Sequence, residues 1–419
     1  MGASSGERGH SDRGLALAVL AAVFLLHLVG RGVGDSYGVF ILPLEREFGW
    51  SRSQITGVYS LYLVVYGVAG PVVGYLFDRW GPRAVYSFGL TSLGLSYILA
   101  AGFGSVWQFH MALGLFAGIG VASVGMVPAS GLVSRWYRGR LGTAIAVAFS
   151  GFAAGMLVMV PFAQYLVEAY GWRMAYRTLG GILLGLLALT LLLPWKTFAA
   201  GRADIAATRK ERTERGGDIN LLQALRMRSF WAMAQVLFFT GMMMFTVLVQ
   251  VVAYLIETGF PPLRAASAYG IAGSLSVVGI IGAGWMGDRL GYRTTVTTSF
   301  ILTVSGIVCL LLLSLYPSYA LLTGFVVLFG LSQGARGPII SALSARLFAG
   351  RGQAAIYGAV TACMGVGAAI GSWASGVLHD WSGNYQASFV FACLCAGFGV
   401  APFWTVPALS NGSSAGSHL

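Results

Sequence analysis

The chain has 419 residues, of which 57% are hydrophobic and only 10% are charged, and its formal net charge is +12. A soluble globule of this composition would expose far too much apolar surface, so the composition excludes a water-soluble domain and indicates a protein whose solvent is lipid. The basic excess does not require a nucleic-acid partner, because Lys and Arg accumulate on the cytoplasmic side of membrane proteins. The four cysteines fall in apolar runs without metal-ligand spacing to histidine, so we expect no metal, cofactor or disulfide.

Twelve apolar runs are long enough to cross a bilayer, which takes roughly 20 residues. Sixty glycines would weaken a soluble helical protein, but small residues let membrane helices pack closely. The sequence therefore predicts an all-α membrane protein with twelve transmembrane helices. The runs are Leu15–Leu42, Ile55–Phe77, Ala84–Phe103, Phe109–Val133, Leu141–Val167, Ala175–Leu193, Phe230–Ile256, Ala265–Met286, Thr294–Leu315, Ala320–Leu347, Ala354–Leu378 and Ala387–Val406.

The first run carries His27, Arg31 and Asp35 at intervals of four residues. In a regular α-helix this spacing places the three side chains on one face, across roughly 12 Å. An ionised side chain at mid-bilayer costs about 2.5–3.5 kcal/mol, so it should face a wet cavity or a partner. Either Arg31 and Asp35 neutralise each other, or Arg31 binds an anion while Asp35 takes up a proton and competes for it. His27 is either a second proton-coupling group or a histidine bonded to a neighbouring helix.

A short charged turn, Gly74 to Arg83, follows the second run and recurs after the eighth as Gly284 to Arg293, 210 positions later. A duplication over this distance predicts two pseudo-symmetric six-helix bundles, an architecture typical of transporters. The predicted organisation is a cytoplasmic tail (1–14), an N-terminal bundle (15–194), a cytoplasmic linker (195–228), a C-terminal bundle (229–408) and a second cytoplasmic tail (409–419).

We expect the repeated turns to be conformational latches. An aspartate at a helix end can accept hydrogen bonds from a neighbouring helix N-terminus, and the arginines can reach acidic groups, so alternating access would break and remake these contacts. The competing explanation, a topology signal of positive charge, does not require glycines at matched spacing. The latch residues are Gly74, Asp78, Arg79, Arg83, Gly284, Asp288, Arg289 and Arg293.

On the seventh run, Gln250 and Tyr254 are placed to hydrogen-bond a solute. The methionines beside them, Met242 to Met244, are expected to pack as an adaptable apolar wall.

The tenth run contains Arg336, which has no acidic residue within a turn; its sequence neighbours supply the amide of Gln333 and a hydroxyl. A buried guanidinium without an acid favours a carboxylate ligand, which it can bind bidentately. The adjacent glycines and Pro338 would open the helix to such a ligand. The alternative is a structural pair between Arg336 and Asp35, which substrate could displace during transport.

Charge sets the expected orientation. With both termini in the cytoplasm, 19 of the 26 Lys and Arg residues lie inside, five lie outside and two lie within spans, which satisfies the positive-inside rule. We therefore expect a multi-pass protein of the bacterial inner membrane, monomeric and surrounded by membrane lipid.

The repeated Gly-x-x-x-Asp-Arg-x-Gly-x-Arg turn resembles the loop signature of the major facilitator superfamily. Within that superfamily, the segment from Tyr37 to Leu44, the following Phe48-Gly49-Trp50-Ser51-Arg52 and the Arg135-Trp136-Tyr137 motif resemble the branch of monocarboxylate porters and oxalate:formate antiporters. The resemblance implies that helices one, four, seven and ten line a central path, which would place the charged residues of helices one and ten where solute passes.

The sequence departs from the pattern of this branch in two respects, one for the antiporters and one for the animal porters. Ile280 and Met364 stand where the antiporters carry an arginine and a lysine, and Asp35 stands where animal monocarboxylate porters carry a lysine. The particular substrate therefore cannot be transferred from the resemblance.

The sequence predicts a secondary transporter, not an enzyme, for small organic anions such as monocarboxylates, with proton symport or anion exchange. In this hypothesis Arg31, Arg336, Gln250, Tyr254 and Gln333 bind substrate, while Asp35 and His27 couple protons. No nucleotide-binding loop is present, which argues against ATP-driven pumping. The alternatives are an efflux transporter of amphipathic compounds and a transport-inactive membrane sensor of the same fold.

Overall fold

The structure is a computed structural model that describes residues 3–50, 52–207, 219–350 and 352–411. Eleven helices of the described residues are long and apolar enough to cross a membrane. One of them lies in α4 (Arg52–Ala100), which turns sharply at Gly81, where φ is 81°. Because α4 contains the second and third predicted runs, the helices account for all twelve runs. The predicted all-α membrane fold is confirmed.

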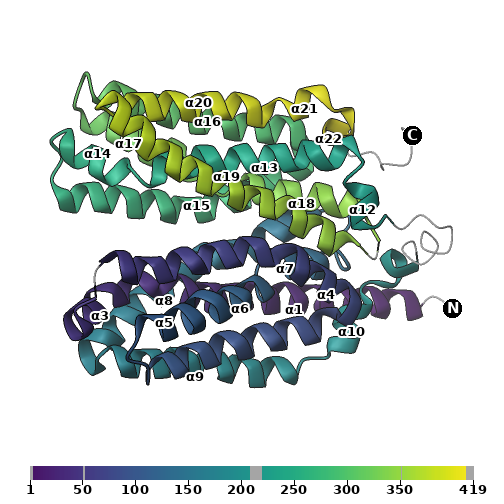
Figure 1. The fold of residues 1–419 in the computed structure, drawn as a ribbon. Helices are drawn as coiled ribbons and strands as arrows, with labels where there is room; N and C mark the ends of the chain where they lie inside the picture. The colour runs from purple at the N-terminus through teal and green to yellow at the C-terminus, as the bar shows by residue number, and fades with distance from the viewer. Residues whose placement is uncertain (1–2, 51, 208–218, 351, 412–419) are drawn as a thin grey trace. The chain divides into compact units, whose positions relative to one another are not determined.

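The chain divides into two compact units, which Figure 1 shows as two groups of helices. Unit 1 comprises residues 1–139, 147–219 and 349–358, and unit 2 comprises residues 140–146, 220–348 and 359–419. Each unit thus includes one short segment from the other half of the sequence. The middle of the predicted linker, 208–218, lies outside the described residues.

Unit 1 begins with an interrupted helix: α1 (Ala3–Leu26), the π-helical turn η1 (His27–Arg31), α2 (Gly32–Gly34) and the 3-10 turn η2 (Asp35–Phe40), followed by α3 (Ile41–Phe48). The fourth predicted run is interrupted too, as α5 (Val106–Phe109), the π-helical η3 (His110–Phe116), α6 (Ala117–Ser123) and α7 (Met126–Val133). Helix α4 packs against α6, α7 and α9. The remaining helices are α8 (Leu141–Tyr170), whose first residues belong to unit 2, α9 (Trp172–Leu191) and α10 (Trp195–Ala200).

Unit 2 repeats this alternation of interrupted and continuous helices. The seventh run is split into α13 (Arg228–Leu248) and α14 (Val251–Glu257), and the tenth into α17 (Tyr319–Ser332) and α18 (Arg336–Leu347). Helix α16 packs against α15, α17 and α20. The other elements are α12 (Leu221–Ala224), α15 (Pro262–Leu290), α16 (Tyr292–Leu313), α19 (Gln353–Ser382), α20 (Gln386–Val400), α21 (Pro402–Thr405) and α22 (Pro407–Asn411).

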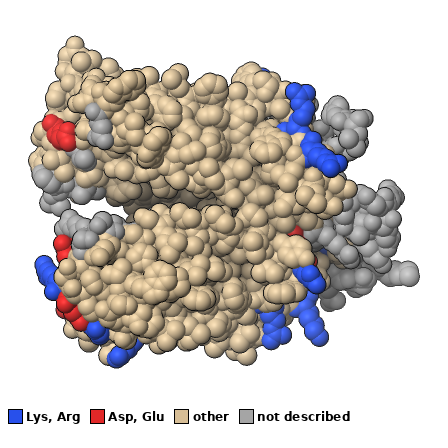
Figure 2. All heavy atoms as spheres, viewed as in Figure 1, with Lys and Arg blue, Asp and Glu red and all other residues tan. Residues whose placement is uncertain are grey.

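The surface of each unit has the charge distribution of a membrane protein. Figure 2 shows the coloured charged side chains at the ends of the helices and an uncharged band between them. Large apolar side chains of the membrane-spanning helices are exposed, among them Val68, Leu99 and Val278 at 66%, 54% and 61%. Such a band requires lipid as its surroundings, so the chain is an integral multi-pass membrane protein.

Candidate functional site

The polar residues of helix one lie where that helix loses regular α-helical geometry. His27 and Arg31 are the first and last residues of the π-helical η1, and Asp35 begins the 3-10 turn η2. Gly30, Gly32 and Gly34 alternate through the segment, and glycine weakens helix interiors. π-helical turns are frequent at functional sites. The three side chains therefore do not follow the regular α-helical spacing expected from the sequence, because the segment contains one π-helical and one 3-10 turn.

Arg31 and Asp35 form an ion pair inside unit 1. Arg31 Nε lies 2.7 Å from Asp35 Oδ2, and the two side chains are only 12% and 4% exposed. The other carboxylate oxygen, Oδ1, accepts hydrogen bonds from the hydroxyls of Tyr62 at 3.2 Å and Tyr59 at 3.4 Å. Asp35 is thus held by three groups, and the intrahelical pair that the sequence allowed is present.

The guanidinium of Arg31 also lies between two aromatic rings. Its central carbon is 4.2 Å from the ring centre of Tyr66 and 4.9 Å from that of Phe152. Cation–π contacts of this kind stabilise a desolvated guanidinium. Arg31 Nη1 is buried and has no hydrogen-bond partner among the described residues, so this nitrogen can still donate hydrogen bonds to a ligand.

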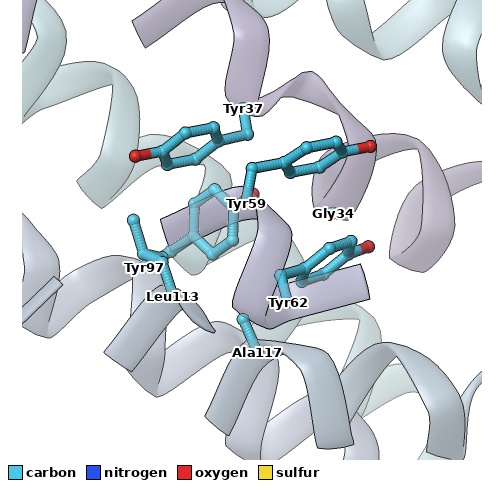
Figure 3. A pocket seen from close by; sticks show the side chains of 7 residues that line it. All are labelled: Gly34, Tyr37, Tyr59, Tyr62, Tyr97, Leu113 and Ala117. Atoms are coloured by element: carbon cyan, nitrogen blue, oxygen red, sulfur yellow. The ribbon is translucent and has the colours of Figure 1, made fainter. Parts of the chain in front are cut away.

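Tyr59 and Tyr62, which bond Asp35, belong to a column of stacked tyrosines with Tyr37. Figure 3 shows the three rings. Tyr37 stacks on Tyr59 at a ring-centre distance of 5.7 Å, and Tyr59 stacks on Tyr62 at 5.3 Å. They border a cavity of about 10 Å³, the size of a single water-sized sphere, closed below by residues such as Ala117. The described conformation therefore has no room for an organic anion in this cavity.

Gly34 allows the tyrosine column to approach helix one. A Cβ atom at this position would lie 2.5 Å from the Tyr62 hydroxyl and 2.6 Å from a methyl group of Val121. The hydrogen bond from Tyr62 to Asp35 thus depends on the missing side chain.

His27 is directed toward α8. Its Nδ1 lies 2.9 Å from the carbonyl oxygen of Ala148, and its ring meets Phe149 edge-on at 5.7 Å. The side chain is 1% exposed, and Nε2 has no hydrogen-bond partner among the described residues. His27 therefore has the bonded environment of the structural alternative, and it keeps one free ring nitrogen.

Arg336 is buried in unit 2 against α16. Its Nη2 donates to the carbonyl oxygen of Ser299 at 3.0 Å and to the hydroxyl of Thr303, and its guanidinium lies 4.0 Å from the ring centre of Phe300. The residue is 1% exposed, and Nε and Nη1 have no hydrogen-bond partner among the described residues. The alternative pair with Asp35 joins two units, and each of these residues has its observed contacts within its own unit.

The other predicted substrate contacts lie at helix breaks. Gln250 precedes α14, is 9% exposed and has a buried Oε1 without a hydrogen-bond partner among the described residues. Gln333 lies between α17 and α18. Tyr254 is different, because its hydroxyl donates to the carbonyl oxygen of Leu310 and its ring packs on Phe389. Its hydrogen-bonding capacity is used within unit 2.

The two repeated turns make equivalent contacts. In unit 2, Asp288 accepts hydrogen bonds from the backbone N–H groups of Gly142 at 3.1 Å and Thr143 at 2.7 Å, in the first turn of α8. In unit 1, Asp78 accepts one from the N–H group of Ala355 at 3.2 Å, in the first turn of α19. Each aspartate therefore meets a helix N-terminus, where a negative charge is favourable.

The glycines of the turns permit these contacts. A Cβ at Gly74 would lie 2.3 Å from the carbonyl oxygen of Ala354, and one at Gly284 would lie 2.4 Å from the Cβ of Ala146. Gly81 and Gly291, which follow in the two turns, have φ of 81° and 86°, a region that favours glycine.

The arginines of the turns have neighbours that the sequence did not indicate. Arg79 donates to the hydroxyl of Tyr75 at 2.9 Å, Arg289 lies over Trp285, and Arg293 lies 3.5 Å from the ring centre of Trp404. The carboxylate of the second turn, Asp288, is approached by Arg346, which lies outside the turn: the distance from Arg346 Nη2 to Asp288 Oδ1 is 3.7 Å. Arg83 is exposed.

The sequence did not single out the aromatic partners of the charged groups. Tyr59, Tyr62 and Tyr66 recur three and four residues apart, which places them on one face of α4, and this spacing was the available signal. Phe152, Phe300 and Thr303 carry no such signal, because only the packing of separate helices brings them to the arginines.

Charged groups at breaks in membrane helices, in a duplicated helical fold, define a solute transporter. The family model of the Major Facilitator Superfamily matches residues 20–284 and 275–416, and the chain belongs to this superfamily. It is accordingly a transporter and not an enzyme.

Comparison with curated proteins places the chain near the monocarboxylate transporters. It is 30% identical to monocarboxylate transporter 13 of Bos taurus over 396 residues, covering 92% of this chain and 88% of that protein. It is 28% identical to monocarboxylate transporter 11 of Homo sapiens, covering 92% and 81%. The predicted resemblance to this branch is confirmed.

Solved structures support the fold. The proton:xylose symporter XylE matches with a TM-score of 0.78 and 15% identity, covering 96% of this chain and 98% of that one. The fucose:proton symporter FucP of E. coli matches with a TM-score of 0.69 and 16% identity, covering 93% and 97%. At these identities the likeness concerns the fold alone.

Proposed function

We propose that this chain is a secondary transporter of small organic anions, with monocarboxylates as the substrate class. The observation that carries the proposal is the state of Arg31, which is buried in an interrupted membrane helix, paired through Nε with Asp35 and left with an unused donor at Nη1. A guanidinium can bind a carboxylate through two parallel hydrogen bonds, and the curated relatives are named monocarboxylate transporters.

The proposed cycle is a competition for Arg31. In the absence of substrate, Asp35 neutralises the guanidinium. When a substrate carboxylate binds Arg31, Asp35 either takes up a proton, so that the buried cation is not shared by two full negative charges, or stays ionised on the hydrogen bonds from Tyr59 and Tyr62 and leaves Arg31 to the substrate. His27, one π-helical turn before Arg31, is the second proposed proton-coupling residue, through its free Nε2.

Arg336 is the second proposed anion contact. Its free Nε and Nη1 could serve a carboxylate, and Gln333 and Gln250, which lie at two helix breaks of unit 2, could add hydrogen bonds. Tyr254 would need to release the carbonyl oxygen of Leu310 to take part.

The latches, the orientation and the location complete the proposal. Asp78 and Asp288 would release their helix N-termini when the conformation changes. The distribution of Lys and Arg supports cytoplasmic termini in a bacterial inner membrane. We propose a monomer that carries its substrate by proton symport or by exchange for a counter-anion.

Uptake into proteoliposomes tests the proposal. We expect flux of labelled lactate, pyruvate, formate or oxalate that responds to an imposed pH gradient, and we expect Asp35→Asn to remove this response. Glu168→Gln is the matched control, because Glu168 is exposed and bonds only Gln164 among the described residues. No flux of any of these anions, or an unchanged response in Asp35→Asn, would contradict the proposal.

A further inference from the structure

A groove is lined by residues at the beginning of α13 and at the end of α21 in unit 2. Figure 1 labels both helices. Its volume is about 320 Å³, and its lining residues do not include the charged residues of helices one and ten. Arg226, Met227 and Arg228 line one side, and Pro402, Thr405 and Val406 line the other. The space is large enough for a phosphate ester with part of its glycerol backbone.

The groove carries positive charge that no acidic side chain of the described residues pairs with. Arg226 and Arg228 are exposed, and neither forms an ion pair within the part of the chain that the structure describes. The segments that build the groove, 219–235 and 400–411, contain no Asp or Glu. Two arginines on one side of a concave surface favour a phosphate group, which a guanidinium can bind bidentately.

The walls of the groove are fixed by hydrogen bonds to backbone. Trp231 donates its indole N–H to the carbonyl oxygen of Leu225 at 2.7 Å, and Gln235 donates to the carbonyl oxygen of Phe398 at 2.9 Å. The second bond ties α13 to α20, so the groove does not require a ligand to form.

Apolar side chains of the groove and of the chain segments that build it indicate the depth at which it lies. Trp231 lines the groove and is 57% exposed. Leu222, four residues before Arg226, is 74% exposed, and Trp404, which precedes Thr405, is 59% exposed. Tryptophan is enriched where membrane helices pass the headgroups, and exposed apolar side chains of this kind favour an interfacial environment. The groove therefore combines a cationic side with an apolar rim at headgroup level.

We propose that this groove binds the headgroup of an anionic phospholipid, with Arg226 and Arg228 on the phosphate and Trp231 beside the glycerol and upper acyl chain. A soluble phosphate would use the arginines but gain nothing from the exposed tryptophans and Leu222, which is why a lipid fits the site better. Basic pockets between membrane helices on the cytoplasmic side bind anionic headgroups by this chemistry. The inference does not depend on the transported substrate.

Native mass spectrometry of the full-length protein in detergent tests the site with added phosphatidylglycerol. We expect retention of one phosphatidylglycerol, weaker retention of phosphatidylcholine and no displacement by millimolar inorganic phosphate. The Arg226→Gln/Arg228→Gln variant should weaken retention by about fivefold per arginine. Thr405→Trp, which keeps both arginines and fills the groove, should weaken retention as well.

Arg13→Gln/Lys196→Gln is the matched control, because it removes two exposed cations from unit 1. This control should retain the lipid like wild type. The proposal is overturned if the Arg226/Arg228 variant or Thr405→Trp binds phosphatidylglycerol like wild type, if the control loses binding equally, or if inorganic phosphate displaces the lipid. Thermal unfolding of each variant in detergent separates lost binding from lost folding.

Discussion

Asp288 and Thr143 are joined by two hydrogen bonds to the same carboxylate oxygen: the backbone N–H of Thr143 lies 2.7 Å and its hydroxyl 2.8 Å from Asp288 Oδ2. The other oxygen, Oδ1, accepts from the N–H of Gly142 at 3.1 Å. Because α8 begins at Leu141, the side chain of a distant turn satisfies donors of its first turn that have no partner within the helix. The carboxylate is suited to this position by its charge as well as by its two oxygens.

The first prediction concerns this carboxylate. Asp288→Asn keeps one acceptor oxygen but removes the negative charge, so it should lower the stability of unit 2 by about 1–2 kcal/mol and reduce anion uptake by about tenfold. Thr143→Ala, which deletes the hydroxyl and leaves both backbone N–H groups, should have a smaller effect on each. The measurements are thermal unfolding in detergent and initial uptake rates in proteoliposomes. Wild-type values for Asp288→Asn would remove the latch from the proposal.

The second prediction uses two glycines of α15. Gly284→Ala would bring a methyl group to 2.6 Å from the carbonyl oxygen of Gly142, whereas an added Cβ at Gly282 meets nothing within 4 Å. We expect Gly284→Ala to destabilise the protein by about 1–3 kcal/mol and to impair uptake, and we expect Gly282→Ala to be neutral or slightly stabilising. Melting temperatures and uptake rates of the two variants provide the comparison. Equal behaviour of the pair would show that the close approach has no consequence.

The repeated turns show which contacts of the site can be predicted from the sequence and which cannot. The duplication, the aspartate at a helix N-terminus and the glycines could be predicted, because each depends on local chemistry that recurs at a fixed spacing. The partners Ala355 and Thr143 could not be, since they come from the other half of the sequence. The aromatic neighbours of Arg289 and Arg293 were missed for another reason: Trp285 lies one turn before Arg289 on α15 and was not considered, and only the packing of separate helices brings Trp404 to Arg293.

The charged residues of helix one show a second limit. Composition and hydropathy located Arg31 and Asp35, and their spacing indicated a pair, because an intramembrane charge needs a partner. The π-helical turn between His27 and Arg31 could not be read from the spacing, which assumed a regular helix. This change of pitch, together with helix packing, decides that His27 meets Ala148 and that Asp35 meets tyrosines of α4.

The third prediction tests the tyrosine contacts of Asp35. Gly34→Ala would place a methyl group 2.5 Å from the Tyr62 hydroxyl, so the hydroxyl must move and its hydrogen bond to Asp35 must lengthen. We expect lower uptake and an altered pH response of the flux. Gly38→Ala is the control, because an added Cβ there meets nothing within 4 Å. Uptake measured across a series of external pH values distinguishes the two. An unaltered profile in Gly34→Ala would argue against a coupling role for Tyr62.

The fourth prediction concerns pH and Glu47, which lies outside the membrane-spanning segments. Hydrogen bonds from the Trp172 indole and from Arg173 lower the pKa of the Glu47 carboxyl below its ordinary value. A lowered folded-state pKa means that the stabilisation is present above the ordinary pKa of about 4.3 and is lost as the pH falls through the folded-state value.

Glu47→Gln should therefore melt at a lower temperature than wild type at pH 7, by about 2 °C or less, since the side chain is 41% exposed and exposed pairs contribute little. As the pH falls below the ordinary pKa, the two melting temperatures should converge, because the wild-type carboxyl takes up a proton and loses the charge that its partners stabilise. Scanning fluorimetry in detergent across a series of pH values from 7 downward measures the difference. A gap that persists unchanged at low pH would show that packing, not charge, stabilises this contact.

The fifth prediction separates a substrate role of Arg336 from a structural one. Arg336→Lys retains the charge but loses the planar fork and the stacking on Phe300, so the KM for the transported anion should rise about tenfold if the guanidinium binds substrate. Thr303→Val removes the hydroxyl that Arg336 uses within unit 2 and leaves the arginine intact, so it should lower the melting temperature while changing KM by less than about threefold. Concentration-dependent uptake and thermal unfolding give both quantities for each variant. If Arg336→Ala retains the wild-type KM, or if Thr303→Val raises KM as much as Arg336→Lys does, the guanidinium is a structural cation held by α16, and Arg31 remains the single proposed anion contact.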